Sequence, residues 1–178
     1  MELFQLLKRM FTMKNKTCCF TGHRVISAED YPEIQKSLEI ELRKLVNQGV
    51  RYFGAGGALG FDTMAALTVL KLRHEYPAIK LILVLPCREQ AARWTDEDKK
   101  TYDYILKQAD KTVYTSERYF NGCMQKRNRH LINSSGVCIC YLTKDKGGAA
   151  YTVEYAQQKE VRIINLAALN YSNLRSTS

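Results

Sequence analysis

The chain of 178 residues carries 27 lysines and arginines against 18 aspartates and glutamates, which gives a formal net charge of +9. Hydrophobic residues make up 46% and charged residues 25%, values that exclude a disordered chain and a coiled coil. This length predicts one domain with a single hydrophobic core, and the apolar runs are too short to cross a bilayer. We therefore expect a soluble protein with no membrane partner.

Strand-like and helix-like segments alternate along the chain. Ile34, Leu38, Leu42 and Leu45 recur at helical spacing, whereas 79–85 is a continuous apolar run typical of a buried strand. The expected strands cover 17–21, 50–53, 79–85, 111–115, 137–142 and 161–165, and the expected helices lie near 34–45, 62–75, 95–108, 121–133 and 152–159. This rhythm predicts an α/β, Rossmann-like, doubly wound and mainly parallel sheet of about six strands with helices on both faces.

We expect one Rossmann-like domain over residues 14–166, between an N-terminal extension or frayed helix at 1–13 and a C-terminal tail at 167–178. Met13 stands directly before the first expected strand and offers an alternative start of the chain. No function is assigned to the extension.

The six cysteines indicate a reduced, cytoplasmic protein. They form no C-x-x-C pair, and the N-terminal stretch carries Glu2 and lacks the small-residue cleavage site of a signal peptide. Cys18, Cys138 and Cys140 lie in β-like runs, where a reduced cysteine behaves as a small hydrophobic residue. We expect no metal site and no required cofactor.

Unusual residues follow four of the expected strands, in the segments 21–24, 54–62, 86–94 and 146–148. All four leave the carboxyl edge of the sheet, where helix N-termini present unpaired N–H groups and a partial positive charge. Each segment alone is typical of an ordinary tight turn. Together they favour a phosphate-bearing ligand at this edge.

The glycine-rich run 54–60 is neither of the two common phosphate-binding motifs. Its last glycine comes one residue too late for the dinucleotide fingerprint, it follows the second strand, and it lacks the Gly-Lys-Ser/Thr ending of a Walker loop. It predicts a turn into a helix that a ligand can approach closely. Asp62 either caps that helix or accepts a hydrogen bond from a sugar hydroxyl or base.

Arg127 lies on the apolar stripe of its expected helix, between Met124 and Leu131. A guanidinium that points inward needs a partner, because burying a lone charge is costly. The alternatives are a structural salt bridge and a bidentate clamp on a phosphate or carboxylate. Arg127 belongs to the stretch 118–129, which carries four bases and no acid.

His23 and Arg24 follow the first strand, at the centre of such a sheet. We interpret His23 as a hydrogen-bond donor to phosphate, with a general base as the alternative. Trp94 is the single tryptophan, and core packing is favoured for it over stacking on a nucleobase.

Taken together, these segments resemble the SLOG superfamily of Rossmann-like domains, which includes the DprA/Smf DNA-processing proteins, the LOG-type phosphoribohydrolases and the YpsA/YoqJ-like bacterial proteins. The chain is most similar to the YpsA-like branch over about residues 14–166. The likeness rests on 19–24, on 56–62, on the spacing of Pro86, Gln90 and Trp94, and on 119–127. It implies a nucleotide or nucleotide-derived ligand, such as NAD or ADP-ribose, at the glycine-rich edge, and a homo-oligomer.

LOG enzymes carry P-G-G-x-G-T-x-x-E and cleave the N-glycosidic bond of nucleoside 5′-monophosphates. The matching run 146–154 keeps both glycines and Glu154, but Lys146, Ala150 and Tyr151 replace the proline, the third glycine and the threonine. Arg127 matches the first LOG arginine, while Asn133 holds the second position. These departures favour phosphate binding without hydrolysis.

The sequence and the resemblance together leave three functions open. The first is a non-catalytic binding or sensor domain for a nucleotide-like small molecule. The second is a phosphoribohydrolase with Glu154 and Arg127 as catalytic residues, and the third is single-stranded nucleic-acid binding, as in the DprA relatives. The expected ligand-binding residues are Thr21, Gly22, His23, Arg24, Gly54, Gly56, Gly57, Gly60, Asp62, Pro86, Gln90, Trp94, Arg127, Gly147, Gly148 and Thr152.

Overall fold

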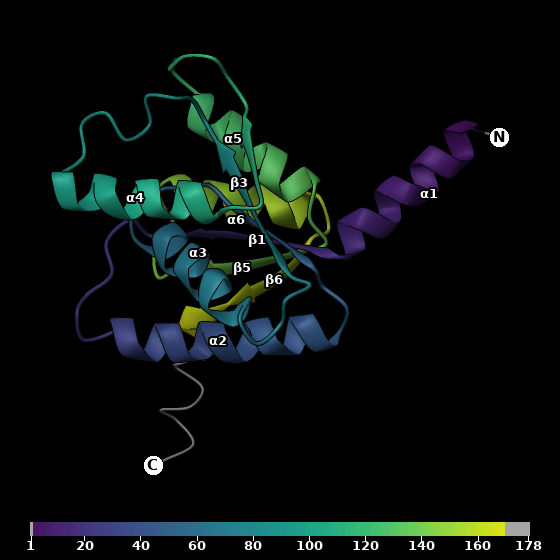
Figure 1. The fold of residues 1–178 in the computed structure, drawn as a ribbon, viewed down its shortest axis with the longest axis horizontal. Helices are drawn as coiled ribbons and strands as arrows, with labels where there is room; N and C mark the ends of the chain where they lie inside the picture. Colours follow the sequence, from purple (N-terminus) through teal and green to yellow (C-terminus); the bar gives the residue numbers. More distant parts are fainter. Residues whose placement is uncertain (1, 170–178) are drawn as a thin grey trace, which may run out of the picture.

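The computed structural model describes residues 2–169, in which six parallel strands form a single sheet of order β4-β3-β2-β1-β5-β6 (Figure 1). The strands are β1 (Thr17–Gly22), β2 (Tyr52–Ala55), β3 (Lys80–Leu85), β4 (Lys111–Tyr114), β5 (Val137–Tyr141) and β6 (Arg162–Asn165). The helices are α1 (Glu2–Asn15), α2 (Tyr31–Asn47), α3 (Phe61–Leu72), α4 (Asp96–Gln108), α5 (Cys123–Asn133) and α6 (Gly148–Gln158), and a further helical segment covers 166–169. The expected doubly wound α/β fold is confirmed.

Helices cover both faces of the sheet, as right-handed crossovers require. On one face α2, α3 and α4 pack over the larger core, where Phe20 and Phe53 of adjacent strands stack with ring centroids 6.3 Å apart. On the other face α5 and α6 pack over a smaller cluster that includes Leu131, Cys138 and Ala156. The second face of the sheet is therefore covered by fewer helices than the first.

The strand order reverses at β1, which lies between β2 and β5. The register pairs Cys18 with Phe53 on one side and with Val137 on the other. The chain leaves β1 toward β2 and leaves β5 toward β6, so the following segments diverge. A crevice forms at the carboxyl ends of such a strand pair, which is the usual ligand site of an open parallel sheet.

Several element boundaries differ from the sequence-based expectation by a few residues, among them the starts of β2 and α6. The second strand begins at Tyr52 because the N–H groups of Arg51 and Tyr52 both donate to the carbonyl of Lys16, at 2.9 and 3.0 Å. The sixth helix begins at Gly148, four residues before the expected start at Thr152. The preceding Gly147 has a φ of 96° and its carbonyl accepts from the N–H of Tyr151 at 3.0 Å, so the glycine pair opens the helix.

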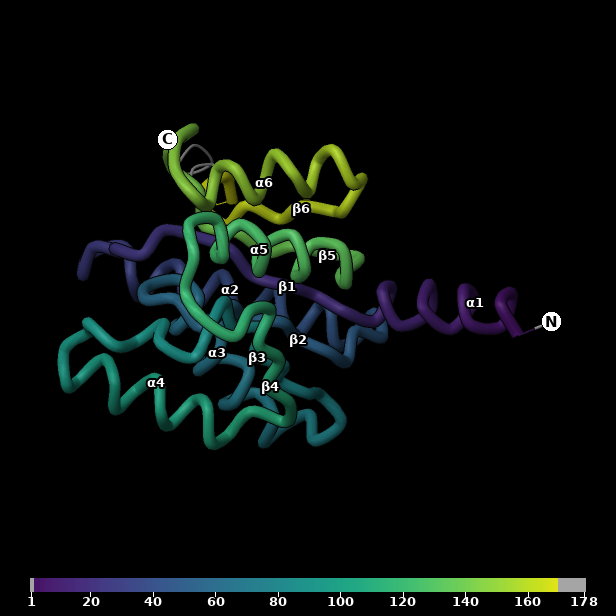
Figure 2. Tube along the Cα trace, turned by 90° about the horizontal axis from the view of Figure 1, so that it is seen from above, coloured from purple at the N-terminus to yellow at the C-terminus, as the bar shows by residue number. Residues whose placement is uncertain are grey.

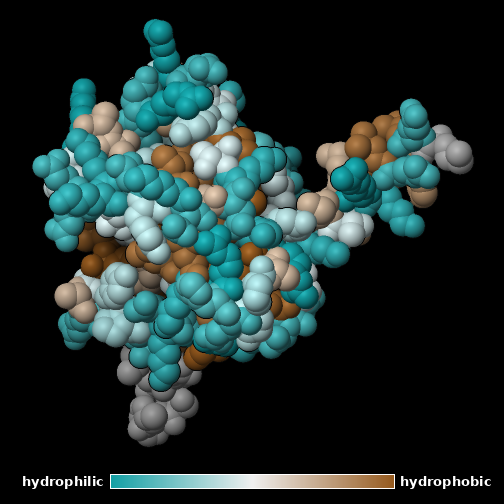
Figure 3. All heavy atoms as spheres, viewed as in Figure 1, coloured by the Kyte–Doolittle hydropathy of each residue, from teal (hydrophilic) through white to brown (hydrophobic). Residues whose placement is uncertain are grey.

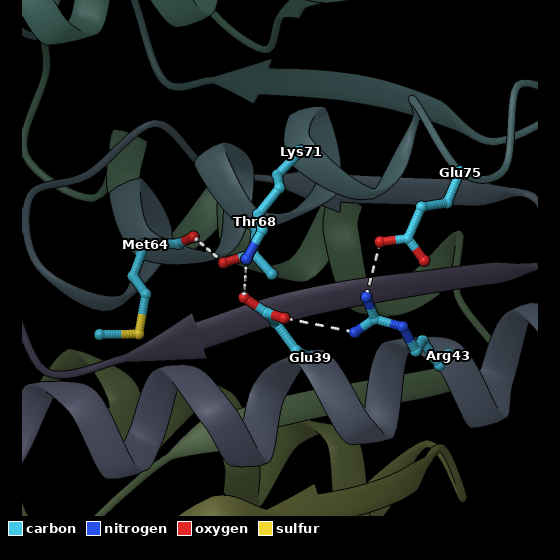
Figure 4. A network of polar contacts seen from close by, with 6 residues as sticks. All are labelled: Glu39, Arg43, Met64, Thr68, Lys71 and Glu75. Carbon is cyan, nitrogen blue, oxygen red and sulfur yellow. Dashed lines mark hydrogen bonds and ion pairs between the residues drawn. The ribbon is translucent and has the colours of Figure 1, made fainter.

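A polar network joins α2 to α3 on the first face (Figure 4). Glu39 accepts from Lys71 at 2.6 Å and from Arg43 at 3.3 Å, and Arg43 also pairs with Glu75 at 2.7 Å. Thr68 donates to the carbonyl of Met64 one turn earlier in α3. These contacts fix the two helices relative to each other at the rim of the core.

The N-terminal helix α1 projects away from the rest of the chain, as both backbone views show (Figures 1 and 2). None of its residues is buried. All six cysteines are unpaired and buried. Within residues 2–169, no helix has the length and apolarity to cross a membrane, and no group of three His, Cys, Asp or Glu side chains is arranged to hold a metal ion.

Candidate ligand site at the carboxyl edge

A cavity of about 240 Å³ lies at the strand-order reversal, beyond the carboxyl end of β1. Its walls come from the segment that ends β1 and from the first turns of α3, α5 and α6, so segments far apart in the sequence meet there. The lining residues are Thr21, Gly22, His23, Arg24, Ala58, Asp62, Met124, Arg127, Asn128, Lys146, Gly147, Gly148 and Ala149.

The cavity is electropositive. Arg24, Lys146 and Arg127 line it, against the single carboxylate of Asp62. The first turns of three helices add the partial positive charge of their N-termini and N–H groups without intrahelical partners. This combination is suited to an anion.

Arg127 is the most constrained side chain of the cavity, with an exposed fraction of 3%. Its Nη1 donates to the carbonyl of Gly56, and its Nε donates to Oδ1 of Asn128 at 2.6 Å. Burial lowers the pKa of Arg127, while the nearby carboxylate of Asp62 raises it. Two hydrogen bonds therefore hold a buried guanidinium in one orientation, and part of its donor capacity is left for a ligand.

Gly56 makes this arrangement sterically feasible. A Cβ at position 56 would overlap the guanidinium of Arg127, lying 2.6 Å from its Cζ, and would also lie 2.8 Å from Oδ2 of Asp62. Gly56 does not itself line the cavity, so its place beside the site is explained by close packing against these two side chains.

Asp62 is buried in the first turn of α3, and its Oδ2 accepts from the N–H of Ala58 at 3.3 Å. Burial raises the pKa of this carboxyl group, and the charge of Arg127 and the Ala58 hydrogen bond oppose that rise. The side chain thus both closes the turn before α3 and supplies the counter-charge for Arg127. These hydrogen bonds differ from the expected helix cap and salt bridge: Asp62 accepts from Ala58 in the turn before α3, and Arg127 donates to Gly56 and Asn128. Both side chains also line the cavity.

The Nε2 atom of His23 lies 2.8 Å from the N–H of Thr143 and 3.0 Å from its hydroxyl. A backbone N–H can only donate, so Nε2 is the acceptor and the proton of the neutral ring is on Nδ1. Burial and, to a lesser extent, Lys144 lower the pKa of His23. The neutral ring therefore retains one donor, Nδ1–H.

Close packing between α3 and the segment at the end of β1 requires glycine at positions 22 and 60. A Cβ on Gly22 would lie 2.6 Å from the ring of Phe61. Gly60 has a φ of 76°, and a Cβ there would collide with the backbone of His23 and Arg24. The N–H of Phe61 donates to the carbonyl of His23 at 3.0 Å, which holds the cavity loop against the start of α3.

A chain of hydrogen bonds links Arg127 to the start of α6. Nδ2 of Asn128 donates to the hydroxyl of Thr152 at 2.8 Å, and that hydroxyl donates to the carbonyl of Gly148 at 2.8 Å. Thr152 is buried behind the cavity wall, so it supports the site without lining it. Sequence reasoning missed Asn128, although its position next to Arg127 was a signal that could have indicated it.

A second hollow of about 530 Å³ adjoins the cavity, and the two share Met124. Trp94 and Tyr119 line it together with Arg93 and Gln90, and the ring of Trp94 also packs edge-on against Tyr102. Gln90 donates through Nε2 to the carbonyl of Gly56 at 3.2 Å. Trp94 is half-buried and belongs to neither core cluster, so it packs against Tyr102 at the edge of an open hollow and not in the core as expected.

The other expected site residues lie elsewhere. Gly54 lines an apolar groove on the second face, Gly57 packs against Leu85, and Pro86 is buried directly after β3. Glu154 is exposed on α6 and is not among the cavity-lining residues. Beyond Asn128, the cavity residues absent from the expected set are Ala58, Met124, Lys146 and Ala149.

Solved structures show the same fold. The chain is similar to DNA processing protein A (DprA) from Streptococcus pneumoniae, with a TM-score of 0.60 and 18% identity, covering 85% of this chain and 50% of that chain. It is also similar to DprA from Helicobacter pylori, with a TM-score of 0.60 and 19% identity, covering 87% of this chain and 66% of that one. The present chain thus spans half to two thirds of these proteins.

Sequence comparison identifies nearer relatives. A UPF0398 protein of Halalkalibacterium halodurans is 32% identical over 130 residues, which cover 71% of this chain and 69% of the relative. A UPF0398 protein of Bacillus cereus is 29% identical over 154 residues, covering 81% and 84%. The YpsA family model, described as the YspA SLOG family, matches residues 19–174. The chain therefore belongs to the YpsA SLOG family.

Proposed function

We propose that this protein binds a nucleotide-like ligand through its phosphate, in the cavity beyond β1, and does not cleave it. The observation that carries the proposal is the buried guanidinium of Arg127, held by Gly56 and Asn128 on the wall of a cavity that three helix N-termini surround. A fixed guanidinium and convergent helix N-termini together form a phosphate site.

The size of the cavity suits the phosphate end of a ligand. Its volume of about 240 Å³ lies below the roughly 300–1,000 Å³ of pockets that enclose a whole drug-sized ligand. The adjoining hollow, entered past Met124, offers the rings of Trp94 and Tyr119 as stacking surfaces. A nucleotide would place its phosphate beside Arg127 and its base toward these rings.

The placement of the carboxylates supports binding without cleavage. Hydrolysis of a glycosidic bond generally uses a pair of carboxyl groups on either side of the bond. Among the described cavity residues Asp62 is the single carboxylate, and Glu154 lies outside on α6. We therefore expect the protein to release its ligand uncleaved.

Single-stranded nucleic acid is a second candidate ligand, favoured by the surface next to the hollow. Tyr119 and Phe120 expose 66% and 45% of their surface beside the exposed bases Arg118 and Lys126. Exposed aromatic rings among bases are typical of sequence-tolerant single-strand binding. The Helicobacter pylori DprA structure, which shares this fold, is described as showing a single-stranded DNA binding mode.

Two double variants with equal charge change separate these candidates. Arg24→Gln with Lys146→Gln removes two bases from the cavity, and Arg118→Gln with Lys126→Gln removes two bases outside it. Thermal shift and titration with AMP, ADP-ribose, NAD and a short single-stranded DNA measure the binding of each. We expect the first variant to lose nucleotide binding at least tenfold, about 1.4 kcal/mol, and the second to retain it.

Two results would contradict the proposal of non-catalytic nucleotide binding. Binding of DNA alone, weakened mainly by the outer variant and falling steeply with salt, would assign the surface to nucleic acid. Release of free base from AMP, detected by chromatography, would contradict the non-catalytic proposal.

A further inference from the structure

Helix α1 presents an apolar face that nothing within residues 2–169 covers. The helix is amphipathic, and its large apolar side chains recur at the spacing of one helical face. Figure 3 shows hydrophobic side chains exposed on this projecting helix. The basic residues Lys8 and Arg9 lie on the opposite side of the helical wheel. The apolar residues of this face, which expose 54–73% of their surface, are Leu3, Phe4, Leu6, Leu7, Met10 and Phe11.

The direction of α1 is set where it joins the sheet. A single residue, Lys16, separates α1 from β1, and its N–H donates to the carbonyl of Met13 at 3.0 Å. The hydroxyl of Thr17 donates to the same carbonyl at 2.8 Å. Gly136 packs against this junction so closely that a Cβ there would lie 3.0 Å from the carbonyl oxygen of Lys14. The junction therefore holds α1 outward.

The second face of the sheet carries a matching apolar groove. It has a volume of about 310 Å³, and its lining includes Ile82 and Val84 of β3, Val113 of β4, Tyr52 of β2, Leu131 of α5 and, at one end, Met13 from the last turn of the chain's own α1. Within residues 2–169, α5, α6 and the last turn of α1 lie on this face, and they leave the β2–β4 side open. A doubly wound sheet normally has helices over both faces, so the groove has the position of an additional helix.

We propose that α1 packs into this groove of a second copy of the same chain, so that two copies exchange helices across a two-fold axis. Each copy has one unpartnered apolar helix and one unfilled groove, which is the self-complementary pairing that an isologous dimer requires. The outward junction at Lys16 directs α1 away from its own sheet and toward a partner.

The dimensions agree with this exchange. The 14 residues of α1 span about 21 Å, close to the length of about 20 Å of the six-residue strand β3, whose Ile82 and Val84 line the groove. At roughly 100 Å² for each of the six apolar side chains, one helix buries about 600 Å², near the about 800 Å² per partner of a standard interface. Each copy also buries its groove, so the paired contacts reach that size.

Sedimentation velocity of the full chain over a wide concentration range tests the proposal. The variant Leu7→Glu with Phe11→Glu places two charges on the apolar face, and its control, Gln5→Glu with Thr12→Glu, adds the same charge on the polar face. We expect the wild type and the control to form dimers and the Leu7/Phe11 variant to dimerise on the order of 100-fold more weakly. Cross-linking gives an independent test. A chain with Lys111→Cys at the groove should be linked by a bismaleimide to a chain with Leu7→Cys, and only when these two variants are mixed.

Three results would overturn the proposal. A wild type that remains monomeric at every concentration shows that no exchange occurs, and a dimer unaffected by the Leu7/Phe11 charges shows that it forms elsewhere. A monomer that binds anionic vesicles through α1 assigns the apolar face to a lipid surface instead. None of these results depends on ligand binding at the cavity, which is assayed separately.

Discussion

The carbonyl of Gly56 accepts a hydrogen bond from Nη1 of Arg127, and the space left by the missing Cβ of Gly56 is filled by that guanidinium. The residue directly after β2 thus fixes the orientation of a charged side chain that lies 71 residues later, on α5. The cationic wall of the cavity depends on this contact.

We predict that Gly56→Ala displaces the Arg127 guanidinium. The new Cβ would lie 2.6 Å from Cζ of Arg127, so we expect a loss of about 1–3 kcal/mol in the free energy of unfolding, together with at least tenfold weaker binding of AMP. Urea unfolding and calorimetric titration measure the two effects. Gly148→Ala is the stability control, because nothing beyond its chain neighbours and the backbone of its own helix lies within 4 Å of the added Cβ. Equal destabilisation of both variants would contradict the steric explanation.

The buried charges of Asp62 and Arg127 should be energetically coupled. Arg127→Met leaves the Asp62 carboxylate buried without its cationic neighbour, and we expect it to cost about 3 kcal/mol of unfolding free energy. Adding Asp62→Asn should recover about 1–3 kcal/mol of that loss, because the remaining charge is then gone. A urea-unfolding double-mutant cycle measures the coupling, and strictly additive losses would show that the two groups do not interact.

His23 should make the fold less stable in mild acid. Its pKa is lowered in the folded state, so as the pH falls below the usual value of 6.5 the unfolded chain takes up a proton before the folded chain does. Stability is therefore full above pH 6.5 and declines until the pH has fallen through the lower folded pKa. His23→Gln retains an acceptor for Thr143 without titrating, and we expect its stability to vary less over this window in unfolding experiments at graded pH. Identical pH profiles would contradict a lowered pKa of His23 in the folded state.

Glu39 should link α2 and α3 in a pH- and salt-dependent manner. Its hydrogen bond with Lys71 lowers its pKa, so the stabilisation is present above the ordinary value of 4.5 and is lost as the pH falls through the lower folded pKa. We expect Glu39→Gln to cost about 0.5–1 kcal/mol at neutral pH and low salt, and less in high salt. Glu154→Gln removes the same charge from an exposed position of α6 and should have no comparable effect. A loss that persists in high salt would assign the role of Glu39 to packing.

The sheet and its helices could be predicted because local patterns determine them. The continuous apolar run of β3 and the four-residue spacing of the leucines in α2 each indicate one type of element, and glycine-rich segments after strands indicate the ligand edge. The buried position of Arg127 also followed from the helical stripe. What it contacts did not, since the Gly56 carbonyl and Asn128 are brought to it by tertiary packing and by a neighbour that no periodicity marks.

The glycines show the limit of sequence reasoning most clearly. Gly22, Gly56 and Gly60 lie around the site as expected, but the structure explains each by contact with Phe61, Arg127 or the backbone of His23 and Arg24. Gly54 even lies on the other side of the sheet, under Leu131. A glycine in a sequence indicates a close approach without indicating what approaches.

The central claim is tested most directly by a crystal structure of the protein soaked with AMP. We predict that the phosphate lies in the cavity, within hydrogen-bonding distance of the Arg127 guanidinium and the backbone N–H groups at the start of α6. AMP bound only outside the cavity, along the exposed bases near Tyr119, would contradict the account, as would a cavity that stays empty at saturating AMP.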